Sequence, residues 1–200
     1  MKEFDEAAAL LPPALRREAQ ALPPLVRRRV EEIRLRSGRP PTAVIGEDEF
    51  PLSQSPVEGR DLELTLEIAT RASAHTALES VRRGYYTVKG GHRVGLCGSV
   101  WTEDGQVKNL RRLSSLNIRV AHAVPGCGEK VLPELLCKGK FLNTLLLSPP
   151  GGGKTTLLRD LVRLLSDGVQ GTAFRVGLCD ERGEVAALWE GRPQFDVGGD

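Results

Sequence analysis

A lysine and two threonines behind three glycines are the residues of this chain best suited to phosphate chemistry. Gly151-Gly152-Gly153 is followed directly by Lys154, Thr155 and Thr156. Glycines let successive backbone N–H groups turn toward an anion, and a helix N-terminus adds partial positive charge. Lys154 is therefore expected to reach the β- and γ-phosphates of a nucleotide, and Thr155 to hold Mg²⁺ by its hydroxyl. Thr156 is expected mainly to support the helix start.

The elements on either side predict a P-loop. An apolar run at residues 141–147 predicts a strand buried on both faces, and apolar residues at helical spacing after Lys154 predict a helix. Strand, glycine-rich loop, Lys-Thr and helix is the P-loop order, although Ser148 stands where the usual pattern has its first glycine. A structural loop without nucleotide is the alternative. The expected nucleotide-binding residues are Ser148, Pro149, Pro150, Gly151, Gly152, Gly153, Lys154, Thr155 and Thr156.

Two carboxylates, Asp180 and Glu181, follow a second apolar run at residues 174–179. The order strand, helix, strand predicts a right-handed parallel crossover. Such sheets place ligands at the carboxyl ends of their strands, so these carboxylates are expected near the glycine-rich loop. Two strands and one helix cannot cover both faces of a parallel sheet, and no second apolar strand ends in Asp or Glu. The predicted nucleotide-binding domain is therefore incomplete.

The composition argues against several other classes of protein. The chain has 28 basic and 26 acidic residues, so its net charge does not imply a polyanionic partner, and its local arginine clusters are best explained as solvated faces. Its four cysteines form no C-x-x-C pair, which favours reduced thiols in a cytosolic protein. No signal peptide is evident, and no apolar run approaches the roughly 20 residues that span a bilayer.

The part before the glycine-rich loop predicts a small α+β domain. A hairpin is expected from residues 85–88 and 92–101, in which Gly95 and Gly98 predict a bulge or a close approach of another backbone. A polar loop is expected at residues 46–59. The other expected strands lie at residues 33–36, 42–45, 107–110 and 117–121, and expected helices at 61–69 and 75–83. The predicted organisation is an N-terminal α+β domain (1–125), a linker (126–140) and a P-loop domain (141–200).

Several runs resemble the stage III sporulation protein AA family, ATPases of spore-forming bacteria. The resemblance covers nearly the whole chain, and the run Gly-Gly-His-Arg-Val-Gly-Leu-Cys-Gly at residues 90–98 is unusually specific. The other runs are residues 32–40, 84–88 and 114–119, the glycine-rich loop, and residues 180–182. That family is similar to secretion and pilus-retraction ATPases. The resemblance implies an N-terminal α/β domain, a RecA-like core, and usually a hexameric ring with ATP bound between subunits.

The resemblance also implies a function. It implies a motor that uses ATP and Mg²⁺ in the mother-cell cytoplasm, at the base of a membrane-embedded assembly joining mother cell and forespore. Related motors orient water or Mg²⁺ with an acidic box, which implies Glu181 as general base, against a helix-entry carboxylate, and Asp180 as a metal ligand.

They also bring N-domain arginines to a phosphate, which implies Arg93, Arg112 or Arg119, against exposed strand-face arginines. Two alternatives remain: a nucleic-acid-handling RecA-like ATPase, although no nucleic acid is expected as a partner, and a nucleotide-binding scaffold without turnover.

Overall fold

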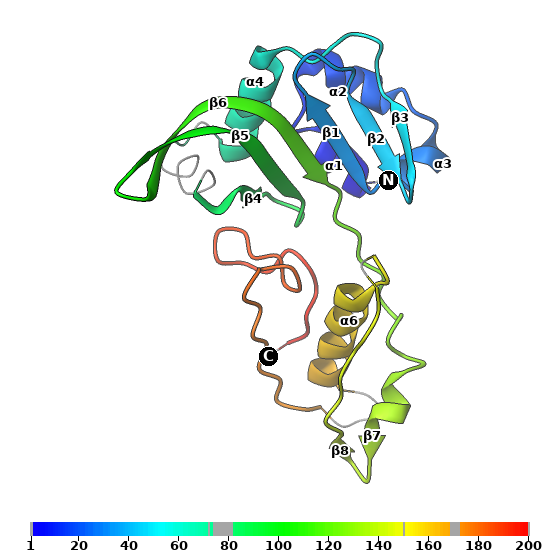
Figure 1. The fold of residues 1–200 in the computed structure, drawn as a ribbon. Coiled ribbons are helices and arrows are strands. Elements are labelled where there is room, and N and C mark those ends of the chain that lie inside the picture. Colours follow the sequence, from blue (N-terminus) through cyan, green and yellow to red (C-terminus); the bar gives the residue numbers. More distant parts are fainter. Residues whose placement is uncertain (1, 72, 74–81, 150, 169–172, 200) are drawn as a thin grey trace. The chain divides into compact units, whose positions relative to one another are not determined.

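The chain folds into two compact units, each with its own cluster of buried side chains. The computed structural model describes residues 2–71, 73, 82–149, 151–168 and 173–199. Unit 1 is Met1–Ala121 and unit 2 is His122–Asp200 (Figure 1). Among the helices of these residues, none is both long enough and apolar enough to cross a membrane.

Unit 1 is built on an antiparallel sheet of six strands in the order β3-β2-β1-β6-β5-β4. The two longest strands, β5 and β6, form one hairpin, and β6 also pairs with β1. The strands are β1 (Glu32–Arg36), β2 (Thr42–Ile45), β3 (Asp48–Pro51), β4 (Tyr85–Thr87), β5 (Arg93–Glu103) and β6 (Gln106–Arg119). The helices of unit 1 are α1 (Lys2–Ala8), α2 (Pro13–Gln20), α3 (Pro24–Arg27) and α4 (Gly59–Thr70).

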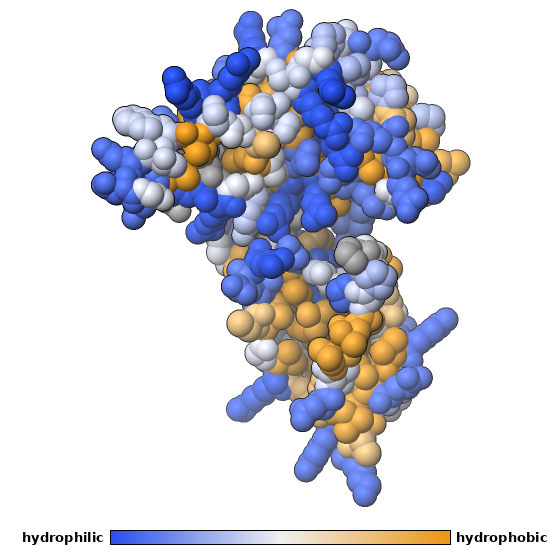
Figure 2. All heavy atoms as spheres, in the orientation of Figure 1, coloured by the Kyte–Doolittle hydropathy of each residue, from blue (hydrophilic) through white to orange (hydrophobic). Residues whose placement is uncertain are grey.

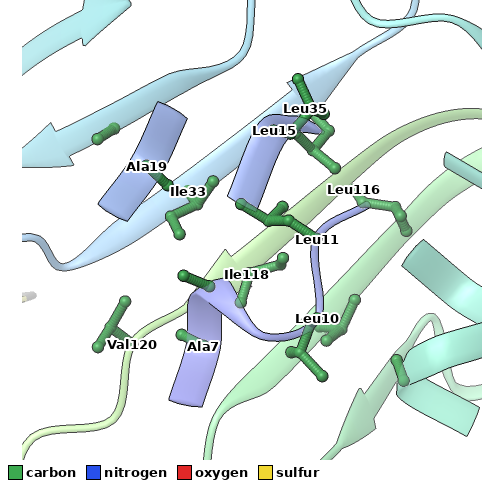
Figure 3. Close-up of a cluster of buried hydrophobic side chains, with 14 of the residues drawn as sticks. Ala7, Leu10, Leu11, Leu15, Ala19, Ile33, Leu35, Leu116, Ile118 and Val120 are labelled. Carbon is green, nitrogen blue, oxygen red and sulfur yellow. The ribbon is translucent and has the colours of Figure 1, made fainter. Parts of the chain in front are cut away.

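One face of this sheet packs against α1, α2 and the turn between them. Leu10 and Leu11 lie in that turn, and Figure 3 shows them among inward-pointing side chains of the sheet. Strand alternation puts Ile33 of β1 opposite Ile118 of β6, and both are fully buried. Burying aliphatic side chains of this size contributes roughly 1.5–3 kcal/mol each, so this layer supplies the main apolar stabilisation of unit 1.

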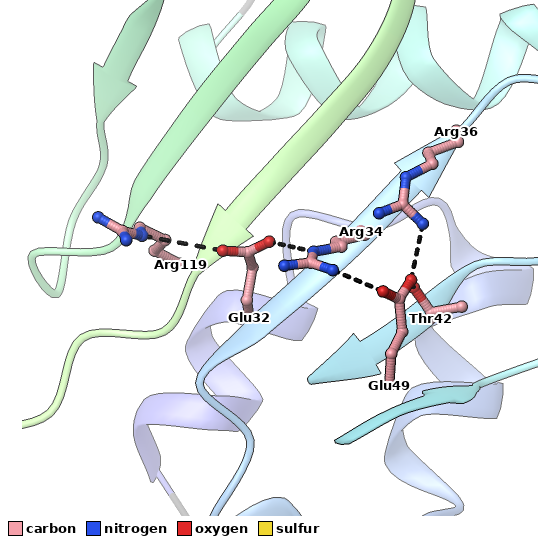
Figure 4. Close-up of polar contacts among 6 residues, drawn as sticks. All are labelled: Glu32, Arg34, Arg36, Thr42, Glu49 and Arg119. Atoms are coloured by element: carbon pink, nitrogen blue, oxygen red, sulfur yellow. Dashed lines mark hydrogen bonds and ion pairs between the residues drawn. The ribbon is translucent and has the colours of Figure 1, made fainter. Parts of the chain in front are cut away.

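The other face carries a network of charged side chains centred on Glu49 of β3 (Figure 4). Hydrogen bonds from Thr42, Arg36 and Arg34 lower the pKa of the Glu49 carboxyl to about 2. The donors are Arg34 Nη1 at 2.5 Å, Arg36 Nη1 at 2.6 Å and Thr42 Oγ1 at 2.6 Å. The sheet is therefore apolar on one face and ionic on the other.

The predicted hairpin is confirmed, and it is longer than the sequence indicated. Tyr85–Thr87 pairs with the start of β5, and β5 pairs with a single β6 instead of two separate strands at residues 107–110 and 117–121. The expected polar loop at residues 46–59 contains β3, which pairs with β2 across a short turn. The predicted helix at residues 75–83 falls mostly outside the described residues.

At Gly98 another backbone segment approaches closely, as the position of this glycine predicted. A register shift separates Cys97 from Gly98, and a Cβ built on Gly98 would lie 2.2 Å from the backbone oxygen of Arg112 on β6. A Cβ on Gly95 would meet nothing nearer than 3.8 Å. Of these two glycines, Gly98 alone is therefore fixed as glycine by its neighbours.

Unit 2 is organised around one long helix, α6 (Lys154–Asp167). A 3-10 turn, η1 (Leu132–Leu135), and a short hairpin of β7 (Leu136–Cys137) and β8 (Lys140–Phe141) lie before it in the chain. The buried cluster of unit 2 is Leu132, Leu161 and Leu165. Figure 2 shows apolar side chains gathered on the visible face of this unit.

The prediction of strands at residues 141–147 and 174–179 is wrong. Apart from Phe141 in β8, neither segment belongs to a sheet in the described part of the chain, so the predicted parallel crossover is not observed there. A parallel strand needs paired neighbours and cover on both faces. Here Leu145 and Leu147 are 79% and 82% exposed, and Leu146 packs against the cluster of unit 2. The apolar run thus has cover on one side alone.

Candidate nucleotide-binding site

The glycine-rich loop leads directly into α6, as predicted. Gly151 and Gly153 have φ angles of 75° and 78°, in the left-handed region that strains other residues. Gly153 is the N-cap of α6, and the first turn of that helix contains no acidic residue. The helix N-terminus therefore keeps its partial positive charge without a neighbouring carboxylate to offset it. Pro150 of the predicted site lies outside the described residues.

The ammonium group of Lys154 points back into this loop. Its Nζ donates to the backbone oxygen of Ser148 at 2.7 Å, to Ser148 Oγ at 3.0 Å and to the backbone oxygen of Pro149 at 2.9 Å. All three acceptors are uncharged, whereas a phosphate oxygen would give a stronger, charge-assisted bond. A phosphate at this loop would therefore offer Lys154 a stronger partner than the ones it has.

Ser148 takes part in this arrangement although the usual motif has glycine at its position. Its hydroxyl donates to the backbone oxygen of Pro149 at 3.0 Å while it accepts from Lys154. A Cβ on Gly152 would lie 2.5 Å from Ser148 Oγ, so the serine side chain excludes a larger residue there. The serine is compatible with the loop because the glycine facing it leaves room.

Thr155 and Thr156 lie half-buried in the first turn of α6. The backbone oxygen of Thr156 accepts a hydrogen bond from the Cys127 thiol at 3.7 Å. Burial, with the nearby Asp160 carboxylate, raises the pKa of Cys127. The backbone of Thr156 therefore joins the helix start to residues before η1, and the supporting role of the Thr156 side chain and the Mg²⁺ role of Thr155 stay predictions.

A buried carboxylate anchors the segment before η1 to α6. Asp160 Oδ2 accepts from the Gly128 N–H at 2.8 Å, and Asp160 Oδ1 accepts from Arg163 Nη2 at 2.8 Å. Burial alone would raise the pKa of Asp160, but the backbone N–H of Gly128 and the Arg163 guanidinium lower it overall. Asp160 stays ionised, and the helix carrying Lys154 is fixed within unit 2.

Asp180 organises the loop that follows it. Its two carboxylate oxygens accept from three successive N–H groups, those of Glu184 at 2.9 Å, Val185 at 2.9 Å and Ala186 at 3.0 Å. Glu181, the predicted general base, is exposed at the start of this turn. The catalytic role of Glu181 and the metal role of Asp180 stay predictions.

Sequence reasoning missed Arg159, which lies on α6 between leucines. It is 8% exposed, and its guanidinium donates to the backbone oxygens of Val185, Glu184 and His122. The ring of Phe195 lies 3.6 Å from the guanidinium carbon. The available signal was a charged pair, Arg159-Asp160, between the apolar residues Leu158 and Leu161 of an amphipathic helix.

Two of the three candidate arginines lie together in unit 1. Arg93 of β5 and Arg119 of β6 are directly opposite each other. Their neighbours Val94 and Ile118 are buried on the face that packs against the helices, so both arginines belong to the ionic face. Like charges directly opposite each other destabilise a sheet unless other groups compensate them.

Other groups do accompany these arginines. The Arg93 guanidinium carbon lies 3.5 Å from the centroid of the Tyr85 ring, and Arg119 Nε lies 3.8 Å from Glu32 Oε2. Arg112 lies earlier on β6, opposite Ser99. The phosphate contact of any of the three stays a prediction.

Comparisons with known proteins identify relatives. Stage III sporulation protein AA of Bacillus subtilis (strain 168) is 40% identical over 196 residues, which are 98% of this chain and 63% of that protein. Protein SEEDLING PLASTID DEVELOPMENT 1 of Arabidopsis thaliana is 28% identical over 168 residues, 82% of this chain and 21% of that protein. The chain therefore spans less than two thirds of the length of either relative.

Two solved structures of ATPase DotB show a weak likeness. The Legionella pneumophila protein has a TM-score of 0.40 at 15% identity, over 71% of this chain and 39% of its own. The Yersinia pseudotuberculosis protein has a TM-score of 0.40 at 13% identity, over 78% and 43%. These scores are too low to support a conclusion.

The family comparison is decisive, because it covers almost the whole chain. The family described as "Sporulation stage III, protein AA" matches residues 4–200. The chain belongs to this sporulation protein family.

Proposed function

We propose that unit 2 binds ATP with Mg²⁺ and supports its hydrolysis. The observation that carries this proposal is the Lys154 ammonium, held inside a glycine-rich loop at the N-terminus of α6. Backbone N–H groups of the loop and the helix start would hold phosphate oxygens, and Lys154 would exchange its neutral acceptors for charged ones. Thr155 would hold Mg²⁺ through its hydroxyl.

The hydrolytic step needs an oriented water and a cation for the developing charge. Glu181 is proposed as the base that takes a proton from water, and an arginine of unit 1 as the cation. A hexameric assembly, a role in the mother-cell cytoplasm and contact with membrane-embedded sporulation components are proposed from the family resemblance.

The decisive experiment replaces Lys154 with alanine. Calorimetric ATP affinity should fall by roughly 10- to 150-fold, because a hydrogen bond to a charged group contributes about 1.5–3 kcal/mol. Lys140→Ala is the matched control, since Lys140 is an exposed lysine of β8 in the same unit.

Circular dichroism should show the same helix content in both variants, because the hydrogen bonds of the Lys154 ammonium all go to oxygens of its own loop. Equal ATP affinity in wild type and Lys154→Ala would refute nucleotide binding at this loop. Binding without turnover in the wild type would favour the scaffold alternative.

A further inference from the structure

Two charged side chains hold the loop after Asp180 by hydrogen bonds to its backbone. On one side, the Asp180 carboxylate accepts from the N–H groups of Glu184, Val185 and Ala186. On the other side, Arg159 donates to the backbone oxygens of Glu184 at 2.8 Å and Val185 at 2.6 Å. The same two residues thus have their N–H groups held by an anion and their C=O groups held by a cation.

The contact with the backbone oxygens of this loop requires an arginine. A buried cation costs free energy unless its donors are satisfied, and Arg159 satisfies them with neutral backbone oxygens. Burial lowers its pKa, but a guanidinium stays charged at any ordinary pH. Its planar fork reaches neighbouring carbonyls in one geometry, which a lysine ammonium would not reproduce.

Further contacts tie a second stretch of the chain to the same place. The Phe195 ring stacks on the Arg159 guanidinium. The backbone N–H groups of Gln194 and Phe195 point to the oxygen of Ala186, at 3.0 Å and 3.4 Å. Side chains at Val185 and Ala186 are buried. The loop is therefore held to α6 through Arg159, and the backbone N–H groups of Gln194 and Phe195 hold it from a second stretch of the chain.

The position of Arg159 connects these contacts to the proposed nucleotide site. It lies on the helix that begins with Lys154 and Thr155, five residues after the lysine, or about 7.5 Å along the axis. Glu181 lies in the turn that Asp180 closes. Arg159 thus links the turn that carries Glu181 to the helix that carries Lys154 and Thr155.

We propose that Arg159 and Asp180 are positioning residues of the nucleotide site, which clamp the loop at residues 184–186 and so hold Glu181 in register with Lys154 and Thr155. The proposal rests on the proposed function of unit 2. Arg159 touches backbone oxygens and a ring, so its loss should change the placement of the base while leaving the phosphate contacts in place.

The test compares Arg159→Gln with a matched control, Arg163→Gln. Arg163 lies on the same helix and pairs with Asp160 and Asp167. Amide hydrogen exchange of residues 184–186 should speed up at least about tenfold in Arg159→Gln, because Arg159 donates two hydrogen bonds to this loop and the loss of one net bond already has that effect. The control should exchange at the wild-type rate in this loop.

Nucleotide affinity and turnover separate positioning from binding. Arg159→Gln should bind ATP within about threefold of wild type, while turnover falls about 10²-fold, the loss expected when a catalytic group is displaced by about 1 Å. Glu181→Gln should lower turnover by about 10²–10⁴-fold and leave loop exchange unchanged. Arg159→Lys keeps the charge and most of the packing, so it replaces Arg159→Gln in the test if that variant does not fold. Its loop exchange should also speed up, and its turnover should also fall.

Several results would overturn the proposal. Loop exchange in both Arg159 variants equal to that of Arg163→Gln would mean that no clamp exists. A released loop with full turnover would leave the clamp without a positioning role. A wild-type chain that binds no ATP would refute the proposed function and the positioning role with it, while the exchange comparison would still decide whether Arg159 holds the loop.

Discussion

Lys154 donates to oxygens of its own loop, so a phosphate must compete with them. Two of the acceptors are backbone oxygens that any sequence would supply, and the third is the Ser148 hydroxyl. Under the proposed function, the residue at this position sets part of the free energy that nucleotide binding would have to replace. The departure from the usual motif would then adjust the affinity for nucleotide.

Ser148→Ala should strengthen ATP binding. The substitution removes the hydroxyl acceptor of Lys154 and keeps the backbone, so the loop should release the lysine more readily. A net hydrogen bond of about 0.5–1.5 kcal/mol corresponds to roughly a two- to tenfold lower dissociation constant. Calorimetry beside Thr144→Ala, another hydroxyl residue of unit 2 whose Oγ1 bonds within its own segment, provides the comparison. Weaker binding by Ser148→Ala would mean that the hydroxyl itself holds nucleotide.

At the scale of elements, local patterns predicted what local interactions form. The helix after Lys154 and the hairpin of β5 were predictable, because amphipathic spacing and turn residues act within a few positions. The sequence did not reveal β3, which begins with the exposed Asp48 and Glu49 and has a single partly buried residue, Phe50, since its strand character comes from pairing with β2. The apolar run after Phe141 looked like a strand, but pairing depends on neighbours that no local pattern specifies.

The candidate site divides in the same way. The start of the helix at Lys154 was predictable from the glycines before it and the apolar spacing after it, and α6 begins there; the binding roles of the loop residues stay predictions. The sequence marked Arg159 only as part of a charged pair, and its contacts were not predictable, because its partners are backbone oxygens distant in sequence. A side chain that recognises main chain is the hardest contact to read from sequence.

Gly98 and Gly95 offer a paired test of the β5–β6 hairpin. Gly98→Ala would push a methyl group into the backbone of Arg112, so unit 1 should lose about 1–3 kcal/mol in its free energy of unfolding. Gly95→Ala lies on the same strand with ordinary contact distances, and it should change stability by less than about 1 kcal/mol. Denaturant unfolding followed by circular dichroism measures both. Equal losses would show that the strand, and not the close approach, decides the cost.

At the scale of the whole molecule, the arginines of unit 1 carry the proposal that both units serve one reaction. Arg93 and Arg119 lie opposite each other, so either could replace the other near an anion. Single alanine variants should therefore lose less turnover than the double variant. The double variant should lose about 10³–10⁵-fold, the range of an arginine finger.

The melting temperature of unit 1 is the internal control for these variants, because surface ion pairs contribute about 0–1 kcal/mol. Arg39→Ala, an exposed arginine of unit 1, should leave turnover unchanged. Arg112→Ala tests the third candidate separately. Normal turnover in the double variant and in Arg112→Ala would return all three arginines to the role of surface residues.

The pairing of β1 with β6 also bears on how unit 1 assembles. Strands β3, β2 and β1 follow one another in sequence, and so do β4, β5 and β6, so each half of the sheet forms from neighbouring segments. The seam between β1 and β6 joins residues far apart in the chain, and closing it costs the most loop entropy. During synthesis β1 cannot pair with β6 until Arg119 has left the ribosome. The pairing at the centre of the sheet is therefore the last to form.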